Sequence, residues 1–175
     1  METCLITGGA GFIGSWLCEA LLEKGYRVIC VDDLSSGIER NIKGIIKNEN
    51  FKFIKHNVVE PLNLNEKIHY IFHLASRASP VDYQAYPIHT LLTNSIGTYN
   101  MLNLARKFNA RFLFSSTSEV YGDPLEHPQR EDYWGNVNPI GIRSCYDESK
   151  RFGEAITMAF FRKFSLDTRI VRIFN

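Results

Sequence analysis

The sequence has almost no net charge of either sign. Its 20 lysine and arginine residues nearly balance 19 aspartate and glutamate residues, and the formal net charge is +1. The basic residues are scattered along the chain instead of forming blocks. Because a basic field is what draws in nucleic acid or an anionic membrane surface, we expect neither as a partner.

Cysteine is scarce, and long apolar runs are absent. The four cysteines show no C-x-x-C spacing, and three of them lie in apolar segments, so we expect buried thiols in a reducing compartment and no metal site. No apolar stretch approaches the length of a membrane span, and the N-terminus lacks the basic and apolar regions of a secretory signal. These absences predict a cytoplasmic protein.

What is present is ordinary for a folded domain: 175 residues, 45% apolar and 22% charged. This length supports one domain with a sizeable core, and we assign residues 1–175 to it. Short apolar runs alternate with amphipathic segments, which predicts the α/β class with a doubly wound parallel sheet of the Rossmann type. The predicted strands are Thr3–Thr7, Arg27–Asp32, Phe51–Lys55, Tyr70–Leu74, Arg111–Ser116 and Thr168–Phe174.

Two segments between the strands have the spacing of an amphipathic helix. We predict that their core-facing stripes are Ile13, Trp16, Leu17, Ala20 and Leu21 in the first, and Phe152, Ala155, Ile156, Ala159 and Phe160 in the second. Residues 122–143 are rich in proline, glycine and asparagine and are predicted to form a long functional loop.

A glycine-rich turn follows the first predicted strand. Gly9, Gly11 and Gly14 match G-x-G-x-x-G, and Gly8 completes the alternative G-x-x-G-x-x-G spacing. Without Cβ atoms the backbone can approach a pyrophosphate at the start of a helix, where free N–H groups and the dipole favour an anion. Asp32 ends the second strand 18 residues beyond Gly14, where its carboxylate favours NAD over NADP. The other interpretation is a glycine-rich turn without a ligand.

Tyr146 and Lys150 are spaced i, i+4 on a helix that Ser144 and Asp147 are predicted to begin as a capping box. An ammonium beside a phenol favours the phenolate, which predicts that Tyr146 acts as a base. By itself the Y-x-x-x-K pattern is common by chance.

A polar segment at the end of the fifth strand strengthens the prediction, because it lies on the sheet edge where ligands bind. In it, Thr117 could hydrogen-bond a hydroxyl that is being oxidised, and Glu119 could move a proton. The alternative is that these residues only form a polar end of the strand and have no catalytic role.

Taken in order, these motifs resemble the extended short-chain dehydrogenases/reductases that act on sugar nucleotides. Within that group the resemblance is closest to the UDP-glucuronate decarboxylases, also called UDP-xylose synthases, and it runs along the whole chain. The segments that carry it are 118–124, 133–141 and 143–148. The resemblance implies NAD-dependent oxidation at C4 of UDP-glucuronate, loss of CO₂ from the 4-keto intermediate, and reduction to UDP-xylose.

The resemblance also implies roles for individual residues. Tyr146 would be the base, Lys150 its electrostatic partner and ribose ligand, Thr117 the hydroxyl-orienting group and Glu119 the group that moves a proton at C5. Cofactor contacts are implied for Gly8, Gly11, Phe12, Ile13, Gly14, Asp32, Asp33, Ser35, Ser36, Gly37, Asn57, Val58, Leu74, Ala75, Thr93, Tyr146 and Lys150. Substrate contacts are implied for Arg77, Ser79, Asn100, Thr117, Glu119 and Asn175.

Three positions depart from the family pattern: Asn57 replaces an aspartate, Asp33 an asparagine and Arg77 a proline. Asn57 and Asp33 could shift cofactor affinity. We hypothesise that Arg77 holds the substrate carboxylate or a pyrophosphate, the alternative being a solvated loop arginine.

Related enzymes leave alternatives open. The 4,6-dehydratases carry an aspartate where Ser118 stands, and 4-epimerases usually lack a carboxylate at position 119, so Ser118 and Glu119 favour the decarboxylase. Family members continue beyond residue 175 into a substrate lobe, so we expect a truncated chain that largely lacks this lobe and could act as a dinucleotide-binding module without turnover. The resemblance also implies a homodimer, formed through helices near residues 89–108 and 146–163. Its interface, called the seam below, could include Leu92, Ile96, Tyr99 and Leu102. Packing of these residues in the core of the domain explains the same stripe equally well.

Overall fold

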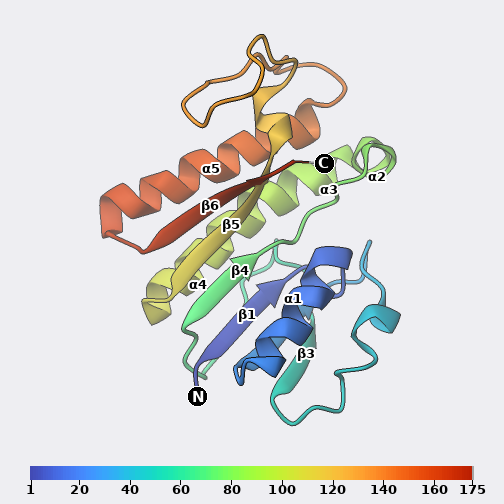
Figure 1. Ribbon diagram of the computed structural model, residues 1–175, viewed down its shortest axis with the longest axis vertical. Coiled ribbons are helices and arrows are strands. Elements are labelled where there is room, and N and C mark those ends of the chain that lie inside the picture. Colours follow the sequence, from blue (N-terminus) through green and yellow to red (C-terminus); the bar gives the residue numbers. More distant parts are fainter. Residues whose placement is uncertain (175) are drawn as a thin grey trace.

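A six-stranded parallel sheet forms the centre of the protein (Figure 1). The computed structural model describes residues 1–174. The strand order is β3-β2-β1-β4-β5-β6, which confirms the predicted Rossmann-type sheet. All six predicted strands are present to within one residue, as β1 (Thr3–Thr7), β2 (Arg27–Asp32), β3 (Phe51–Lys55), β4 (Tyr70–His73), β5 (Arg111–Thr117) and β6 (Thr168–Ile173).

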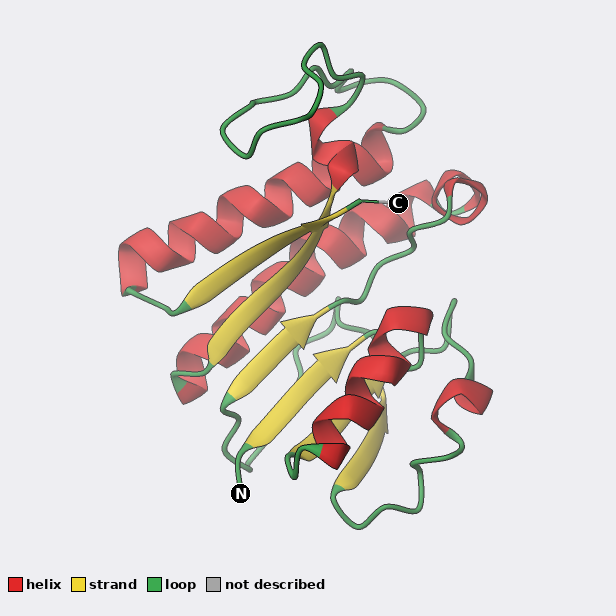
Figure 2. Ribbon diagram, in the orientation of Figure 1, coloured by secondary structure: helices red, strands yellow, loops and turns green. Residues whose placement is uncertain are grey.

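Helices cover both faces of the sheet, with α1 on one face and α4 and α5 on the other (Figure 2). Successive strand residues alternate between two apolar cores: Leu5 and Ile29 belong to the core under α4 and α5, while Ile6 and Cys30 belong to the core under α1. The helical segments are α1 (Phe12–Glu23), η1 (Glu39–Ile42), α2 (Pro80–Ala85), α3 (Pro87–Leu92), η2 (Thr93–Gly97), α4 (Thr98–Phe108), η3 (Ser118–Tyr121) and α5 (Ser144–Phe164).

The strand order reverses between β1 and β4, because the chain fills the sheet from β1 toward β3 and then from β4 toward β6. At such a switch point the loops after the two strands diverge and leave a crevice at the carboxyl ends. The glycine turn after β1 and the loop after β4 therefore start side by side and both border this opening.

The predicted core-facing stripe of α1 is confirmed at Leu17 and Leu21 and is wrong at Ile13, Trp16 and Ala20. Ile13 and Trp16 are 50% and 65% exposed, and the buried positions include Gly14, Cys18 and Leu21. The helix packs against the sheet through small side chains, which lets its first turn approach β1 closely. Hydrophobic spacing alone could not show this, because the largest apolar residues of the first turns, Phe12, Ile13 and Trp16, are exposed.

The predicted stripe of α5 is also displaced, for the same reason. Phe152, Ala155 and Ala159 are exposed, whereas Phe160 of the predicted stripe is buried together with Gly153 and Thr157, which lie outside that stripe. A Cβ atom at Gly153 would lie 2.2 Å from Cζ of Phe114 in β5, so this glycine sets how closely α5 packs on the sheet. The capping box is wrong too, since α5 begins at Ser144 without a side-chain cap.

A buried histidine joins the two strands of the switch point to α4. Nδ1 of His73 lies 2.7 Å from Oγ1 of Thr7, and its Nε2 lies 3.1 Å from Oγ1 of Thr98. Oγ1 of Thr7 accepts hydrogen bonds from the N–H groups of Leu74 and Ala75, so its own proton must point to Nδ1. Burial lowers the pKa of His73 to about 3, which keeps the ring neutral and consistent with this arrangement.

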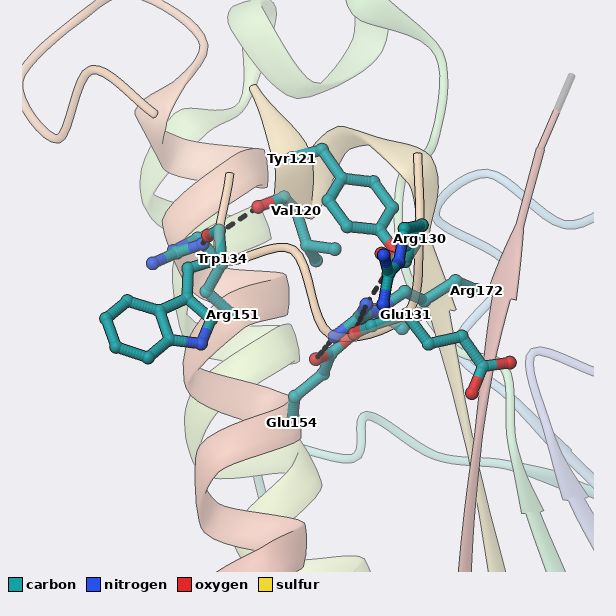
Figure 3. A network of polar contacts seen from close by, with 9 residues as sticks. Val120, Tyr121, Arg130, Glu131, Trp134, Arg151, Glu154 and Arg172 are labelled. Carbon is teal, nitrogen blue, oxygen red and sulfur yellow. Dashed lines mark hydrogen bonds and ion pairs between the residues drawn. The ribbon is translucent and has the colours of Figure 1, made fainter. Parts of the chain in front are cut away.

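Two arginines anchor the loop of residues 122–143 to the sheet and to α5 (Figure 3). Arg172 in β6 donates to both carboxylate oxygens of Glu154, to the Tyr121 hydroxyl and to the carbonyl of Glu131. Arg151 in α5 donates to the carbonyls of Val120 and Trp134 at 2.8 Å. The loop contains no helix or strand of its own, as predicted, yet these bonds hold its middle, at Glu131 and Trp134.

Candidate functional site

A cavity of about 470 Å³ opens at the carboxyl ends of β1, β2, β4 and β5. It contains all the site residues named from the sequence except three. Those that line it are Gly8, Gly11, Phe12, Ile13, Gly14, Asp32, Asp33, Ser35, Ser36, Gly37, Asn57, Val58, Leu74, Ala75, Arg77, Thr93, Thr117, Glu119, Tyr146 and Lys150.

Two of the three remaining residues lie outside the cavity lining. Ser79 is exposed at the N-terminal end of α2. Asn100 in α4 donates its amide to the carbonyls of Val58 and Val59, at 3.0 and 2.8 Å, and so holds the segment after β3. Asn175 lies outside the described residues.

The glycine turn is built so tightly that side chains would not fit. Gly8 has φ +70°, and a Cβ at Gly14 would lie 2.1 Å from the carbonyl oxygen of Gly8. This packing brings the first turn of α1 to the cavity wall, where Gly11, Phe12 and Ile13 contribute backbone. The first N–H groups of a helix have no intrahelical acceptor, so this wall is suited to an anion.

Asp32 joins the glycine turn to the loop after β2. Its carboxylate accepts hydrogen bonds from the N–H groups of Ala10, at 3.0 Å, and Leu34, at 2.8 Å. Burial raises the pKa of Asp32, an effect that these two hydrogen bonds oppose. The carboxylate still lines the cavity, where its remaining lone pairs can accept hydrogen bonds from hydroxyl groups of a ligand.

Tyr146 lies in the first turn of α5, on the β5 side of the cavity. Its ring stacks on Tyr83 of α2, with centroids 4.8 Å apart and ring planes 3° apart. Burial raises the pKa of Tyr146, and a hydrogen bond with Thr117 opposes that rise. The expectation that Lys150 by itself lowers the pKa of Tyr146 is therefore wrong for the chain alone.

The position and burial of Lys150 explain this correction. Its Nζ donates to the carbonyl of Ser115 at 2.8 Å and lies 5.8 Å from the centre of the Tyr146 ring. The side chain is buried, and burial lowers the pKa of Lys150 to about 7. A lysine that is only partly charged near neutral pH stabilises a phenolate less than the i, i+4 spacing suggests.

Glu119, at the start of η3, forms an ion pair with Arg143 at the end of the anchored loop. Nε of Arg143 also lies 3.7 Å from a carboxylate oxygen of Asp147. Burial raises the pKa of Asp147 to about 6, and Arg143 opposes the rise. The arginine therefore places a positive charge between the carboxylate of Glu119, which lines the cavity, and the buried carboxylate of Asp147.

Arg77 is not a solvated loop arginine, because only 8% of the residue is exposed. Its terminal nitrogen donates to the carbonyl of Ser35 at 3.0 Å, and its guanidinium lies 4.3 Å from the ring centre of Tyr86. The residue therefore crosses from the loop after β4 to the loop after β2.

Sequence reasoning missed several residues of the cavity wall. Tyr83 lies in a six-residue helix that is too short to show a periodic signal. Arg143 follows a loop without regular structure, so no spacing linked it to Glu119. His89 is also part of the wall and places Nε2 3.6 Å from Oδ2 of Asp33.

The described residues 1–174 contain neither a candidate metal site nor a helix fit to span a membrane. No three His, Cys, Asp or Glu side chains in this part of the chain are grouped as metal ligands would be. None of its helices is both long and apolar enough to cross a bilayer.

Comparison with known sequences gives strong matches along nearly the whole chain. A family model described as GDP-mannose 4,6 dehydratase matches residues 5–175. UDP-glucuronic acid decarboxylase 4 of Arabidopsis thaliana is 54% identical over 98% of this chain and 38% of its own length. UDP-glucuronic acid decarboxylase 1 of Danio rerio is 54% identical over 98% of this chain and 40% of its own length. UDP-glucuronic acid decarboxylase 6 of Arabidopsis thaliana is 51% identical over 98% of this chain and 50% of its own length. The chain thus spans at most half the length of these curated relatives.

Solved structures with the same fold include a dehydratase and an epimerase that are named for nucleotide sugars. A dTDP-glucose 4,6-dehydratase from Streptomyces venezuelae, solved with NAD and TYD bound, has a TM-score of 0.87 at 28% identity. A UDP-glucose 4-epimerase from Thermotoga maritima, solved with UDP-glucose, has a TM-score of 0.83 at 31% identity. Each match covers 98% of this chain and 55% of the other.

Proposed function

The chain belongs to the GDP-mannose 4,6 dehydratase family, and on that premise we propose that it carries the NAD site and the catalytic groups of a UDP-glucuronate decarboxylase. The observation that carries the proposal is the convergence of Thr117, Glu119, Tyr146 and Lys150 on one cavity with the glycine turn. The identity of 51–54% to proteins named UDP-glucuronic acid decarboxylase supports this choice of reaction.

The residues of the β1–β2 side fit NAD. A Cβ at Gly14 would collide with Gly8, so the turn is kept free of side chains where a pyrophosphate would approach. Asp32 offers a carboxylate to the ribose hydroxyls and would repel the additional phosphate of NADP. The dehydratase from Streptomyces venezuelae, with NAD bound, shares this fold.

The residues of the β5 side fit an oxidation at a sugar hydroxyl. Tyr146 would take the proton of the C4 hydroxyl, and Thr117 would orient that hydroxyl. NAD⁺, held by the glycine turn, Asp32 and Lys150, would supply reversible hydride transfer at C4. The resulting ketone is β to the carboxylate, so the C5–carboxylate bond breaks, CO₂ leaves and its electron pair forms an enolate. Glu119 governs protonation at C5, and Tyr146 returns its proton as the C4 ketone is reduced.

Because the pKa of Tyr146 is raised in the chain alone, the base needs further positive charge nearby. The proposed role of Lys150 therefore includes holding the ribose of the cofactor, from a position fixed by the carbonyl of Ser115. The charged nicotinamide ring of NAD⁺ would supply the field that this lysine only partly provides.

The position of Glu119 favours decarboxylation over the two related reactions. Position 118 carries a serine where the 4,6-dehydratases carry the aspartate that helps to expel water, and Glu119, a carboxylate that 4-epimerases usually lack, lines the cavity. The epimerase and dehydratase structures are 31% and 28% identical to the chain, well below the decarboxylases.

Two further features belong to the proposal. We propose a homodimer whose seam includes Leu92, Ile96 and Tyr99, which are 39–49% exposed on neighbouring helical turns. Leu102 is fully buried in the core and is removed from the predicted seam.

A cytoplasmic location is supported by the four cysteines, all of which are free and buried.

Product analysis tests the proposed function. The chain, and a chimera that continues it with the C-terminal region of the Arabidopsis thaliana decarboxylase 6, are each incubated with UDP-glucuronate and NAD⁺. We expect CO₂ and UDP-xylose from the chimera, and loss of both when Tyr146→Phe is introduced. A folded chimera that binds NAD⁺ but converts UDP-glucuronate only to its C4 epimer would contradict the proposal.

A further inference from the structure

Arg77 is held in place from two sides and still has hydrogen-bonding capacity to spare. One terminal nitrogen is bound to the carbonyl of Ser35, and the ring of Tyr86 supports the guanidinium. Within the described residues, its Nε is buried and has no hydrogen-bond partner. A buried donor without an acceptor costs free energy, so a ligand that supplies an acceptor there would be bound favourably.

The position of Arg77 indicates which ligand atoms it would meet. It lies two residues after Ala75, whose backbone would be 2.9 Å from a Cβ at Gly8 in the glycine turn. The loop after β4 therefore runs directly beside that turn, and Arg77 lines the same cavity as the first turn of α1. An anion at the helix N-terminus would lie between these two positive walls.

The direction in which Arg77 extends separates the two ligands that the sequence left open. Its bond to Ser35 points the guanidinium toward the loop after β2. Thr117, Glu119 and Tyr146 belong to the β5 side, where the reacting end of the sugar would lie. The arginine is thus directed to the cofactor side of the cavity, beside the glycine turn, and not to the substrate carboxylate.

We propose that Arg77 is a ligand of the cofactor diphosphate, which it contacts from the side of the cavity opposite the start of α1. This inference rests on the proposed NAD site, and it does not depend on the reaction that follows. The contact between Nε2 of His89 and Oδ2 of Asp33, 3.6 Å apart, makes a second link between the α3 side and the loop after β2, in the same region. Arg77 and Asp33 are two of the positions that depart from the family pattern, and both connect the two sides of this cavity.

Calorimetry tests the inference by measuring how tightly the 175-residue chain binds adenosine, ADP and NAD⁺. Arg77→Gln should weaken the binding of ADP and NAD⁺ about tenfold or more and leave the affinity for adenosine unchanged, because only ADP and NAD⁺ carry a diphosphate. Arg77→Lys should recover part of the loss by restoring the charge. Arg106→Gln is the matched control, since Arg106 also lies 4.3 Å over an aromatic ring, that of Phe164, but is outside the cavity lining.

The ligand series also shows how the inference could fail. Equal weakening of adenosine and ADP would mean that Arg77 only supports the Ser35 loop, and unchanged binding of all three would mean that it contacts no ligand. Either result overturns the inference. If the wild-type chain binds neither ADP nor NAD⁺, this inference and the proposed NAD site both fail. Tight ADP binding that depends on Arg77, without any decarboxylation by the chimera, would retain the inference and reject only the reaction.

Discussion

The ring of Tyr146 lies flat against the ring of Tyr83, with 4.8 Å between centroids and 3° between planes. Tyr83 is 2% exposed and belongs to α2, so a helix distant in sequence sets the orientation of the proposed base. The two rings and Cys145 form a small core of their own. The catalytic geometry therefore depends on a contact outside α5.

Replacing Tyr83 tests this dependence. Tyr83→Leu should lower the turnover of the chimera by about threefold to tenfold, since an aromatic pair contributes about 0.5–1.5 kcal/mol beyond its buried area. Tyr83→Phe keeps the stacking and should retain most of the activity. Equal activity of the leucine and phenylalanine variants would show that stacking does not position Tyr146.

Gly153 offers a test of how α5 is seated. Gly153→Ala should destabilise the chain by about 1–3 kcal/mol in urea unfolding, because the added Cβ would meet the ring of Phe114. Gly44→Ala is the control, since no described atom lies within 4 Å of a Cβ at that exposed position. If the two substitutions have the same effect, α5 does not press on β5 as described.

Lys150 makes stability depend on pH in a defined direction. Its pKa is about 7 in the fold and 10.5 as a free side chain, so between these values the unfolded chain binds more protons. Stability should therefore rise with pH from about 7 toward 8.5, as the buried ammonium loses its proton. Below pH 7 both states are protonated, and the full cost of burying the charge applies.

Lys150→Met should remove this contribution. We expect its melting temperature to exceed that of the wild type by about 3–6 °C at pH 6.5, and the difference to shrink by pH 8.5. Lys163→Met, at an exposed lysine of the same helix, should show no such pH-dependent difference. If the melting temperatures of Lys150→Met and the wild type differ by the same amount at every pH, Lys150 does not titrate in this range.

Arg143 links the carboxylates of Glu119 and Asp147, and its removal should be visible in the titration of Asp147. Arg143→Gln should raise the pKa of Asp147 above its value of about 6, because a neighbouring positive charge is lost. Carboxyl carbon NMR follows this directly. We also expect decarboxylation by the chimera to fall about tenfold, since Glu119 loses its ion-pair partner.

Arg130→Gln is the control for Arg143. Arg130 lies on the same loop but pairs with Asp132 in an exposed position, with side chains 73% and 72% accessible. It should change neither the titration of Asp147 nor the rate. An unchanged pKa of Asp147 in Arg143→Gln would show that the arginine does not act on this carboxyl group.

Local signals account for what the sequence predicted well. Several of the six strands are nearly continuous apolar runs, and the glycine turn is defined by residues close together in the sequence, so both could be predicted without tertiary information. The face on which α1 and α5 pack could not, because Gly14 and Gly153 carry no hydrophobic signal although they allow the closest approach to the sheet.

Contacts between distant segments account for what was missed. The pairing of Glu119 with Arg143 spans a loop without periodicity, and the stacking of Tyr83 on Tyr146 joins residues 63 positions apart. The pKa of Tyr146 was predicted with the wrong direction because spacing shows proximity but not burial. Burial acts on Tyr146 and Lys150 together and weakens the charge that was expected to assist the base.

The most direct test of the central claim follows the hydrogen atoms of the sugar. The chimera is given UDP-glucuronate labelled with deuterium at C4, and a second reaction with unlabelled substrate is run in D₂O. The account predicts UDP-xylose that keeps the C4 label in the first reaction and gains one solvent deuterium at C5 in the second, because hydride returns to its carbon while Glu119 governs protonation at C5. A product that retains its carboxylate, is inverted at C4 and carries no solvent deuterium would contradict it.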